Sequence, residues 1–189
     1  MRVDLAKICA KIDADDRLRE ENPFMSVWQS LSLLLHLTAN ALWLGGIVYF
    51  LVVAGPAVQD EAIGANIAIK TMNRCRIGLE LLSWTAIALL LLTGIVNLIL
   101  RNPSAAPSES YLVLLGVKLF LFGAMATHHG LQVFKYGPRI AALTAEIQPN
   151  ATEWPEPLIE HWRRWFLLLK INAGLGPIVV LLGLALVKG

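Results

Sequence analysis

Six ionisable side chains lie within otherwise apolar stretches of this sequence, and their types limit the chemistry that the chain could perform. An ionisable group inside a membrane span is costly, so such residues are functional candidates by default. A neutral imidazole binds haem iron and also suits copper, whereas a lysine can hold an anion such as a haem propionate. For Glu80, the alternative is a structural ion pair with Lys170 or Arg76. The six residues are His36, Glu80, Lys118, His128, His129 and Lys170.

The first candidate site centres on His36, which shares one face of a predicted helix with Asn40 and Trp43 because their spacing is i, i+4 and i+7. Counted from the ends of the apolar stretches at about 1.5 Å per residue, His36, Thr93 and Lys118 lie at one depth, roughly 10 Å below the surface that we call side A. We interpret this layer as a b-type haem site in which His36 is the axial ligand and Lys118 is the partner of a propionate. The alternatives are that Lys118 only extends to the surface and that His36 only hydrogen-bonds a neighbouring helix.

A second candidate site lies nearer the opposite surface, side B, where His128 and His129 follow Met125 by one helical turn. Adjacent residues on a helix cannot both face the same neighbour, so we expect one of the two histidines to have a structural role. His36 and this pair differ in depth by about 13 Å, which makes them poor partners for one haem. Copper(I) prefers soft ligands, and the soft ligands on side B are Met72, Cys75, Met125 and His128. The metal candidates are His36, His128, His129 and Met125, and His129 is also a candidate haem ligand.

Four long apolar stretches must position these side chains. A helix needs about 20 apolar residues to cross the bilayer core, and each stretch reaches that length. Each is apolar on all sides, and none alternates with the period of two that a strand would need. The sequence therefore predicts an all-α fold, an integral membrane bundle of four transmembrane helices. The predicted spans are about 28–54, 77–100, 111–134 and 165–187, within a membrane domain over 28–189.

The composition of the chain supports this class. Of its 189 residues, 56% are hydrophobic and only 16% are charged, and the mean hydropathy is +0.60, whereas a soluble domain carries about a quarter charged residues. A water-soluble enzyme and a disordered chain are therefore excluded. The net charge of +2, without a basic patch, argues against nucleic acid as a partner. The expected partners are the lipid bilayer and either other membrane subunits or a second copy.

Glycine and proline mark the ends of the predicted spans. Gly55-Pro56 is expected to close the first span, and Tyr136-Gly137-Pro138 the third. Residues 1–27 form a charged tail, which is either solvated or an amphipathic helix with apolar residues at helical spacing. Near the spans, seven basic residues lie on side B and four on side A, which favours side B in the cytoplasm and the N-terminus in the periplasm.

Several of these motifs resemble the copper resistance D (CopD) domain. The stretch HLTANALWLGG, residues 36–46, is similar to the first helix of that domain, which has a histidine, a small apolar run and then Trp-x-Gly-Gly. Arg74-x-Arg76 ahead of the second span, Lys118-Leu119 and Arg163-Arg164 resemble its later helices. The resemblance covers about 31–188, and it implies copper handling in a bacterial inner membrane.

The same pattern is similar to HemJ-type protoporphyrinogen oxidases, four-helix membrane proteins that bind b-type haem. Their first helix also has a histidine seven residues before a tryptophan, as His36 and Trp43 have here. Their third helix has a Lys-Leu pair and a histidine eleven residues on, a spacing that Lys118 and His129 reproduce. The resemblance implies that His36 and Lys118, with Arg76 as a further member, form the functional set. The stretch VYFLVVAGPAV after the first motif is closer to CopD than to HemJ.

Three functions follow from the residues and the resemblance. The leading one is binding of a redox cofactor or metal within the bilayer, above all b-type haem, for electron transfer or as part of a membrane complex. The second is copper transport or copper resistance, and the third is a structural accessory subunit without a cofactor. As an enzyme, the chain would at most be a HemJ-like oxidoreductase or a subunit of one, and no residue is assigned a catalytic role.

Overall fold

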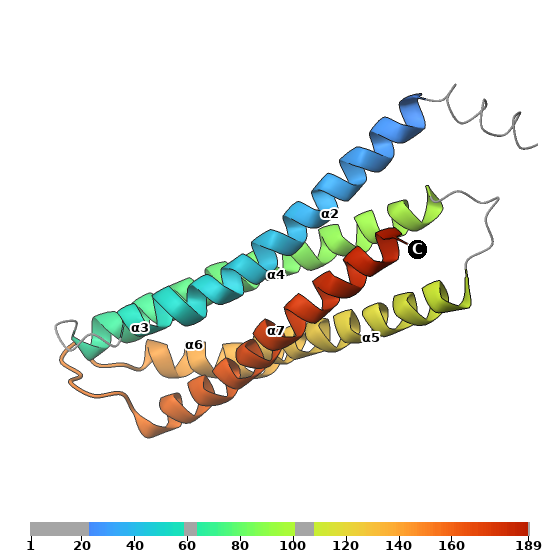
Figure 1. The fold of residues 1–189 in the computed structure, drawn as a ribbon. Coiled ribbons are helices and arrows are strands. Elements are labelled where there is room, and N and C mark those ends of the chain that lie inside the picture. The colour runs from blue at the N-terminus through green and yellow to red at the C-terminus, as the bar shows by residue number, and fades with distance from the viewer. Residues whose placement is uncertain (1–22, 59–63, 101–107, 189) are drawn as a thin grey trace, which may run out of the picture.

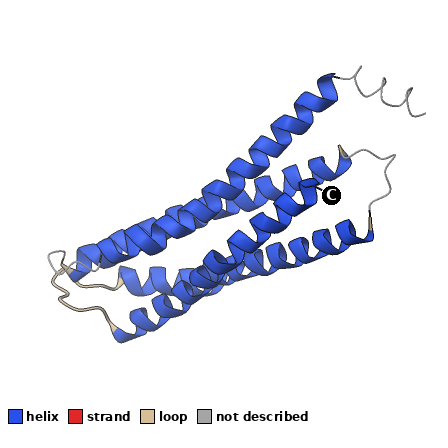
Figure 2. Ribbon diagram, viewed as in Figure 1, coloured by secondary structure: helices blue, strands red, loops and turns tan. Residues whose placement is uncertain are grey.

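The computed structural model describes residues 23–58, 64–100 and 108–188, and this part of the chain is helical apart from short turns and loops (Figure 2). The prediction of an all-α fold is confirmed. The predicted amphipathic helix in the N-terminal tail lies, up to residue 22, outside the described residues. Four helical passages are long and apolar enough to cross a membrane, namely Val27–Ala57, Ala65–Ile99, Glu109–Ala145 and Glu156–Leu186.

Two of the four passages combine an α-helix, a five-residue π-helical segment and a second α-helix (Figure 1). Side A is the end of the bundle where the first passage begins and the fourth ends, and side B is the opposite end. The first passage consists of α2 (Pro23–Tyr49), η1 (Phe50–Ala54) and α3 (Gly55–Ala57), and the second is α4 (Ala65–Ile99). The third consists of α5 (Glu109–Leu131), η2 (Gln132–Tyr136) and α6 (Gly137–Ala145), and the fourth is α7 (Glu156–Lys188).

Each π-helical segment is followed directly by a Gly-Pro pair, and the wider π turn explains why the helix continues through it. In a regular α-helix, a proline ring clashes with the carbonyl of the preceding turn. Here the Gly55 N–H donates to the Phe50 carbonyl, and the Gly137 N–H donates to the Gln132 carbonyl, five residues back in both cases. The prediction that Tyr136-Gly137-Pro138 ends the third span is therefore wrong, because the helix continues beyond it as α6.

The helices also extend beyond the predicted spans at side B. The second passage begins at Ala65 rather than at residue 77, and α7 likewise begins before its predicted span. In the added turns of α4, Ile69 and Met72 are buried, whereas Lys70 and Arg74 are exposed. Such an amphipathic segment packs its apolar face against neighbouring helices, although its opposite face is polar. Hydropathy marks only the fully apolar part of each helix, and therefore underestimates its length.

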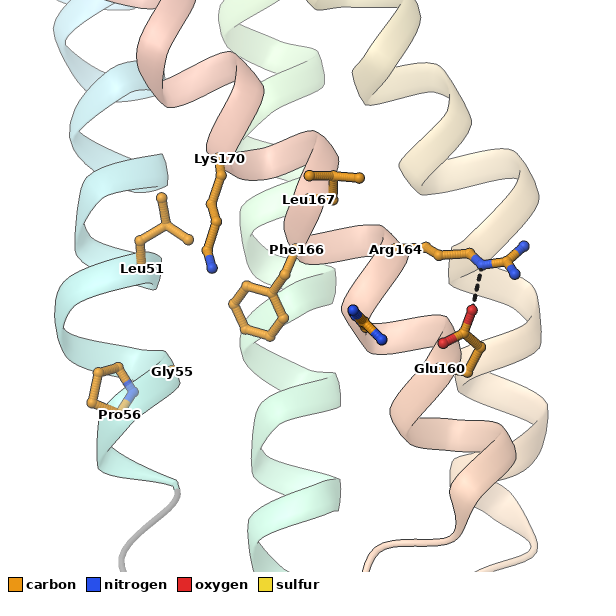
Figure 3. Close-up of a pocket in the computed structure, with 9 residues that line it drawn as sticks. Leu51, Gly55, Pro56, Glu160, Arg164, Phe166, Leu167 and Lys170 are labelled. Carbon is orange, nitrogen blue, oxygen red and sulfur yellow. Dashed lines mark hydrogen bonds and ion pairs between the residues drawn. The ribbon is translucent and has the colours of Figure 1, made fainter.

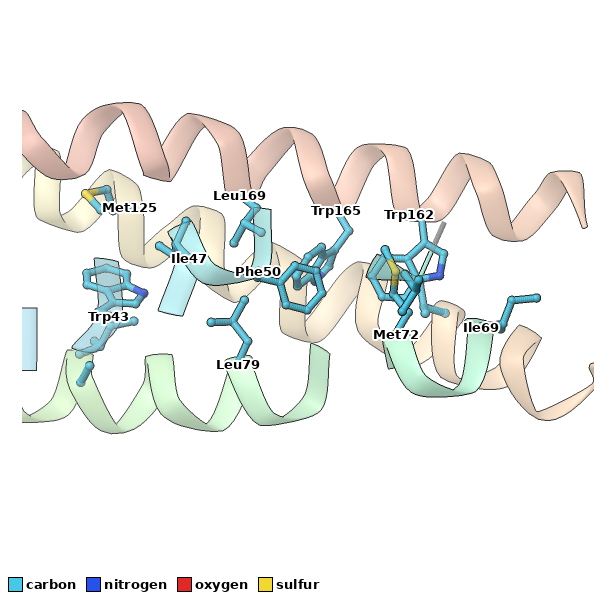
Figure 4. Close-up of a cluster of buried hydrophobic side chains, with 14 of the residues drawn as sticks. Trp43, Ile47, Phe50, Ile69, Met72, Leu79, Met125, Trp162, Trp165 and Leu169 are labelled. Carbon is cyan, nitrogen blue, oxygen red and sulfur yellow. The ribbon is translucent and has the colours of Figure 1, made fainter. Parts of the chain in front are cut away.

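The four passages form two antiparallel pairs, with α2 against α4 and α5 against α7 (Figure 1). Toward side B, a buried cluster of large side chains joins the pairs (Figure 4). In this cluster the ring centroids of Phe50 and Trp165 lie 5.1 Å apart, and those of Trp162 and Trp165 lie 5.4 Å apart. Toward side A, the start of α2 leans away from the other passages (Figure 1). Side B therefore holds the pairs together, and side A is the more open end of the bundle.

Most of the apolar surface of the four passages faces outward. In the most apolar 18-residue stretch of each passage, the buried share is only 6% for the third passage and at most 28% for the others. Large exposed side chains include Leu92, Phe120 and Leu181. Soluble monomers rarely expose a continuous apolar patch of this extent. The outward surface therefore fits contact with a lipid bilayer, as expected for a multi-pass membrane protein.

Candidate functional site

His36 is held in place by the threonine that the sequence puts at the same depth. Its Nδ1 lies 2.7 Å from Thr93 Oγ1, and Thr93 Oγ1 lies 2.6 Å from the Leu89 carbonyl oxygen. A carbonyl oxygen only accepts, so the threonine hydroxyl donates its one proton to Leu89 and accepts the proton of His36 Nδ1. His36 Nε2 is left with its lone pair. Histidines that ligate a metal typically have this tautomer, fixed by a hydrogen bond from the second ring nitrogen.

Small and polar residues surround the His36 ring where α2 meets α4. A Cβ at Gly94 would lie 3.7 Å from His36 Cε1, so the α4 backbone approaches the ring closely. The buried Ser32 hydroxyl donates to the Thr93 carbonyl at 3.4 Å. The buried Asn97 Oδ1 has no hydrogen-bond partner among the described residues. The contact between α2 and α4 is therefore polar at a depth where both helices are otherwise apolar. Polar groups at such a depth make this contact a candidate functional site.

Lys118 reaches the same layer from α5. Its half-buried side chain lies against α7, where a Cβ at Gly183 would lie 3.1 Å from Lys118 Nζ. Gly176 lies against Leu44 of α2, and Gly183 and Leu37 each lie seven residues nearer side A, so Lys118 contacts α7 near the level of His36. No carboxylate in the described part of the chain forms an ion pair with it. The structure thus brings His36, Thr93 and Lys118 to one level of the bundle, with a cation available to an anion.

The two other predicted residues on this helix face lie closer to the middle of the bundle. Asn40 is half-buried, one turn from His36. Trp43 is 2% exposed and packs edge-on against Phe122 of α5, with the ring centroids 6.0 Å apart. Trp43 therefore joins the two helix pairs and closes the His36 layer toward side B, which is a packing role.

His128 has an orienting partner of its own on α7. Its Nδ1 lies 3.1 Å from Asn172 Oδ1, and Asn172 Nδ2 donates to the Met125 carbonyl at 3.1 Å. The Met125 carbonyl fixes which way the amide points, because the amide nitrogen must face that oxygen. His128 Nδ1 must then donate to Asn172 Oδ1, and its Nε2 keeps its lone pair. His128 is therefore a second oriented imidazole.

His129 faces a different helix from His128, as the sequence predicts for adjacent residues. Its ring is buried against Trp84 of α4, with the centroids 5.3 Å apart. Its Nε2 is buried and has no hydrogen-bond partner among the described residues. Along α4, the contact of His129 with Trp84 and that of His36 with Thr93 are nine residues apart (84 to 93), which is about 13 Å. The predicted separation between the two layers is confirmed.

The soft ligands proposed for copper are spread over the bundle rather than gathered. Met72 and Met125 lie at opposite ends of the buried cluster (Figure 4), and Cys75 is exposed. Only His128 and Met125 are neighbours, through Asn172. Within the described ranges, no three His, Cys, Asp or Glu side chains come close enough to hold a metal ion together. A four-ligand site from both methionines, the cysteine and the histidine is not present.

A buried ion pair lies near the side B end of α4. Arg76 donates to Glu80 Oε1 at 2.5 Å and to Asn73 Oδ1 at 3.0 and 2.9 Å. Trp165 Nε1 also donates to Glu80 Oε1, at 3.4 Å. A Cβ at Gly137 would lie 2.7 Å from the Arg76 guanidinium, so a glycine is needed where η2 ends. The network ties α4 to both α6 and α7.

The sequence left Arg76 and Lys170 as alternative partners for Glu80, and the structure pairs Glu80 with Arg76. Sequence reasoning missed Asn73 and Gln132, whose side-chain amide donates to an α7 backbone carbonyl at 3.0 Å. The spacing of Asn73, Arg76 and Glu80 on one helix face could have revealed the first. No local pattern reveals Gln132, because its partner lies 33 residues away in the sequence.

No protein-family model, no curated protein and no solved structure matches this chain. The resemblance to the CopD domain and to HemJ-type oxidases therefore stays a prediction from the motifs quoted above. The contacts within the two polar layers are the physical basis for a functional assignment.

Proposed function

We propose that the protein is a CopD/HemJ-like integral membrane protein that binds b-type haem at the His36 layer. One observation carries the proposal. The hydrogen bond from His36 Nδ1 to Thr93 leaves Nε2 with an open lone pair inside the bundle, on a ring whose orientation is fixed. Neutral imidazole in this state is a common axial ligand of haem iron.

The residues around His36 fit such a group. Lys118 supplies a cation with no described carboxylate partner, which suits a haem propionate. The start of α2 leans away from the other passages at this end of the bundle (Figure 1), and the ring is bordered by Thr93 and Gly94 of α4. When bound, haem supplies one-electron exchange. In this arrangement His36 would hold the haem iron, Thr93 would fix the imidazole ring and Lys118 would neutralise a haem propionate.

Electron transfer within a membrane complex is the role that this arrangement supports best. The layer lies inside a bundle whose outward surface is apolar, so a bound redox group would be shielded from water. The bacterial inner membrane, with side B in the cytoplasm, is the location that the motifs and the basic residues favour.

An absorption spectrum of the detergent-purified protein tests the proposal. We expect a Soret band, with sharp α and β bands after dithionite reduction. His36→Ala is expected to abolish these bands while the helical circular dichroism stays unchanged. The matched control is His128→Ala, which removes an equally oriented imidazole from the other layer and should leave the bands in place. A folded wild-type protein without these bands, or full haem retention in His36→Ala, would overturn the proposal.

Copper handling is the second candidate, and His128 is the observation that favours it. Asn172 orients this ring and leaves Nε2 with its lone pair, on a residue one helical turn from Met125. Metal analysis after copper(I) loading should show copper that disappears in His128→Ala and persists in His36→Ala. Equal loss in both variants, or in neither, would count against a copper site in this layer.

A further inference from the structure

A groove lies on the outside of the bundle at side B, between α7 and the end of the first passage (Figure 3). Its volume is about 560 Å³. One wall is formed by η1 and α3, and the other by successive turns of α7. The lining includes Leu51, Arg163, Arg164, Phe166, Leu167 and Lys170.

Two cations of this groove form no ion pair within the described residues. Arg164 forms an ion pair with Glu160 at 2.8 Å, so both of their charges are matched. Arg163 and Lys170 are exposed, and neither pairs with a carboxylate in the described part of the chain. They lie seven residues apart, on the same face of α7. The groove therefore carries two unmatched positive charges about 10 Å apart along the helix.

The rest of the groove is apolar and opens toward the region that lipid must occupy. The Lys170 side chain runs between Leu51 and Phe166 toward the side B end (Figure 3). The first passage packs closely against α7 here, since a Cβ at Gly55 would be in van der Waals contact with the Phe166 ring, at 3.6 Å. Arg163 lies near the start of α7, where the chain enters the bilayer, and Lys170 lies deeper. A ligand must therefore carry negative charge at the interface and hydrocarbon below it.

We propose that this groove binds an anionic glycerophospholipid, with its phosphodiester headgroup between Arg163 and Lys170 and an acyl chain along Leu51 and Leu167. Basic pockets between transmembrane helices bind anionic headgroups by this combination of charge and apolar contact. A free phosphate ion would satisfy the cations and leave the apolar wall uncovered, so the lipid is the better match. The assignment is independent of the haem site, which lies at the other end of the bundle.

Native mass spectrometry of the purified protein tests this assignment, with phosphatidylglycerol and phosphatidylcholine titrated separately. We expect preferential binding of phosphatidylglycerol. Arg163→Gln with Lys170→Gln should reduce its affinity by about 25-fold, or about five-fold for each cation removed, and leave phosphatidylcholine binding unchanged. The matched control is Lys135→Gln with Arg139→Gln, which removes two exposed charges from the same end of the bundle outside the groove.

Three outcomes would overturn the assignment. The first is an absence of headgroup preference in the wild-type protein. The second is an equal loss of preference in the control variant, which would indicate general surface charge. The third is displacement of bound phosphatidylglycerol by millimolar inorganic phosphate, which would indicate a site for the anion alone. Haem spectra of the same samples keep this test separate from the proposed function, because the four substituted residues lie outside the His36 layer.

Discussion

The two ends of this bundle are built on opposite principles, although the same four passages form both. At side B, aromatic rings and a buried Arg76–Glu80 pair fill the space between the helix pairs. At side A, the hydrogen bond from His36 to Thr93 stays within one pair, and Lys118 stays on the other. At side B, Arg76 and Glu80 are hydrogen-bonded within the bundle, whereas at side A one imidazole nitrogen and one ammonium stay open. The difference separates a network that holds the helices together from a pair of groups that can bind a ligand.

Breaking the side B network should have the largest effect on stability. Arg76→Met leaves the Glu80 carboxylate buried with only Trp165 as its partner, and removal of one member of a buried ion pair typically costs about 3–5 kcal/mol. We expect a lower midpoint of thermal unfolding in detergent, with the absorption bands of the proposed haem unchanged in the protein that remains folded. The double variant with Glu80→Leu should recover most of the loss, because no uncompensated charge remains. A single variant as stable as the wild type would show that the pair does not hold side B together.

Crowding the same network should have the next largest effect. In Gly137→Ala, the new methyl group would lie 2.7 Å from an arginine nitrogen whose side chain is held by three hydrogen bonds. Overpacking of this kind costs about 1–3 kcal/mol. Gly123→Ala in α5 is the matched control, since nothing lies within 4 Å of its Cβ position. Thermal unfolding should separate the two, with the control as stable as the wild type or slightly more so.

At side A, loss of the orienting hydrogen bond should affect binding more than folding. Thr93→Val keeps the shape of the side chain and removes the acceptor of His36 Nδ1. Loss of such an orienting partner typically weakens metal affinity 10–100-fold, and we expect roughly that loss of haem affinity in a titration. Thr85→Val is a close control, because Thr85 makes the same type of hydrogen bond to the carbonyl four residues back but is exposed. Equal affinities in the two variants would mean that Thr93 does not position the ligand.

The sequence predicts the two ends of the bundle to different extents. Apolar length is a local property of the chain, so the four passages and their order could be read directly. Helical spacing is also local, and it correctly placed His36, Thr93 and Lys118 at one level. The length of α4 and α7 could not be read this way, because their outer turns are amphipathic and are stabilised by packing against other passages.

The hydrogen-bonded network of Arg76 and Glu80 at side B depends on contacts between segments that are distant in the sequence. Gly137-Pro138 reads as a helix end unless the π turn before it is known, and that turn fits because Arg76 and Glu80 lie against it. Similarly, a histidine pair gives no indication of which ring meets Asn172 and which meets Trp84. Rotation of each helix about its axis decides such contacts, and no short pattern in the sequence encodes it.

The smallest expected effect tests whether Lys118 belongs to the open end as a binding group. In Gly183→Ala, the new methyl group would lie 3.1 Å from Lys118 Nζ, the far end of a flexible side chain that can move away at little cost. The helix itself gains up to about 1 kcal/mol from replacing glycine by alanine, so thermal stability should not fall. If Lys118 holds an anionic group beside His36, displacing its ammonium should weaken haem retention by less than ten-fold, about one charge-assisted contact. Gly174→Ala, in the same helix with nothing within 4 Å of its Cβ position, should leave retention unchanged. If retention in Gly183→Ala equals that of the control, Lys118 only extends toward side A, and the open end binds through His36 alone.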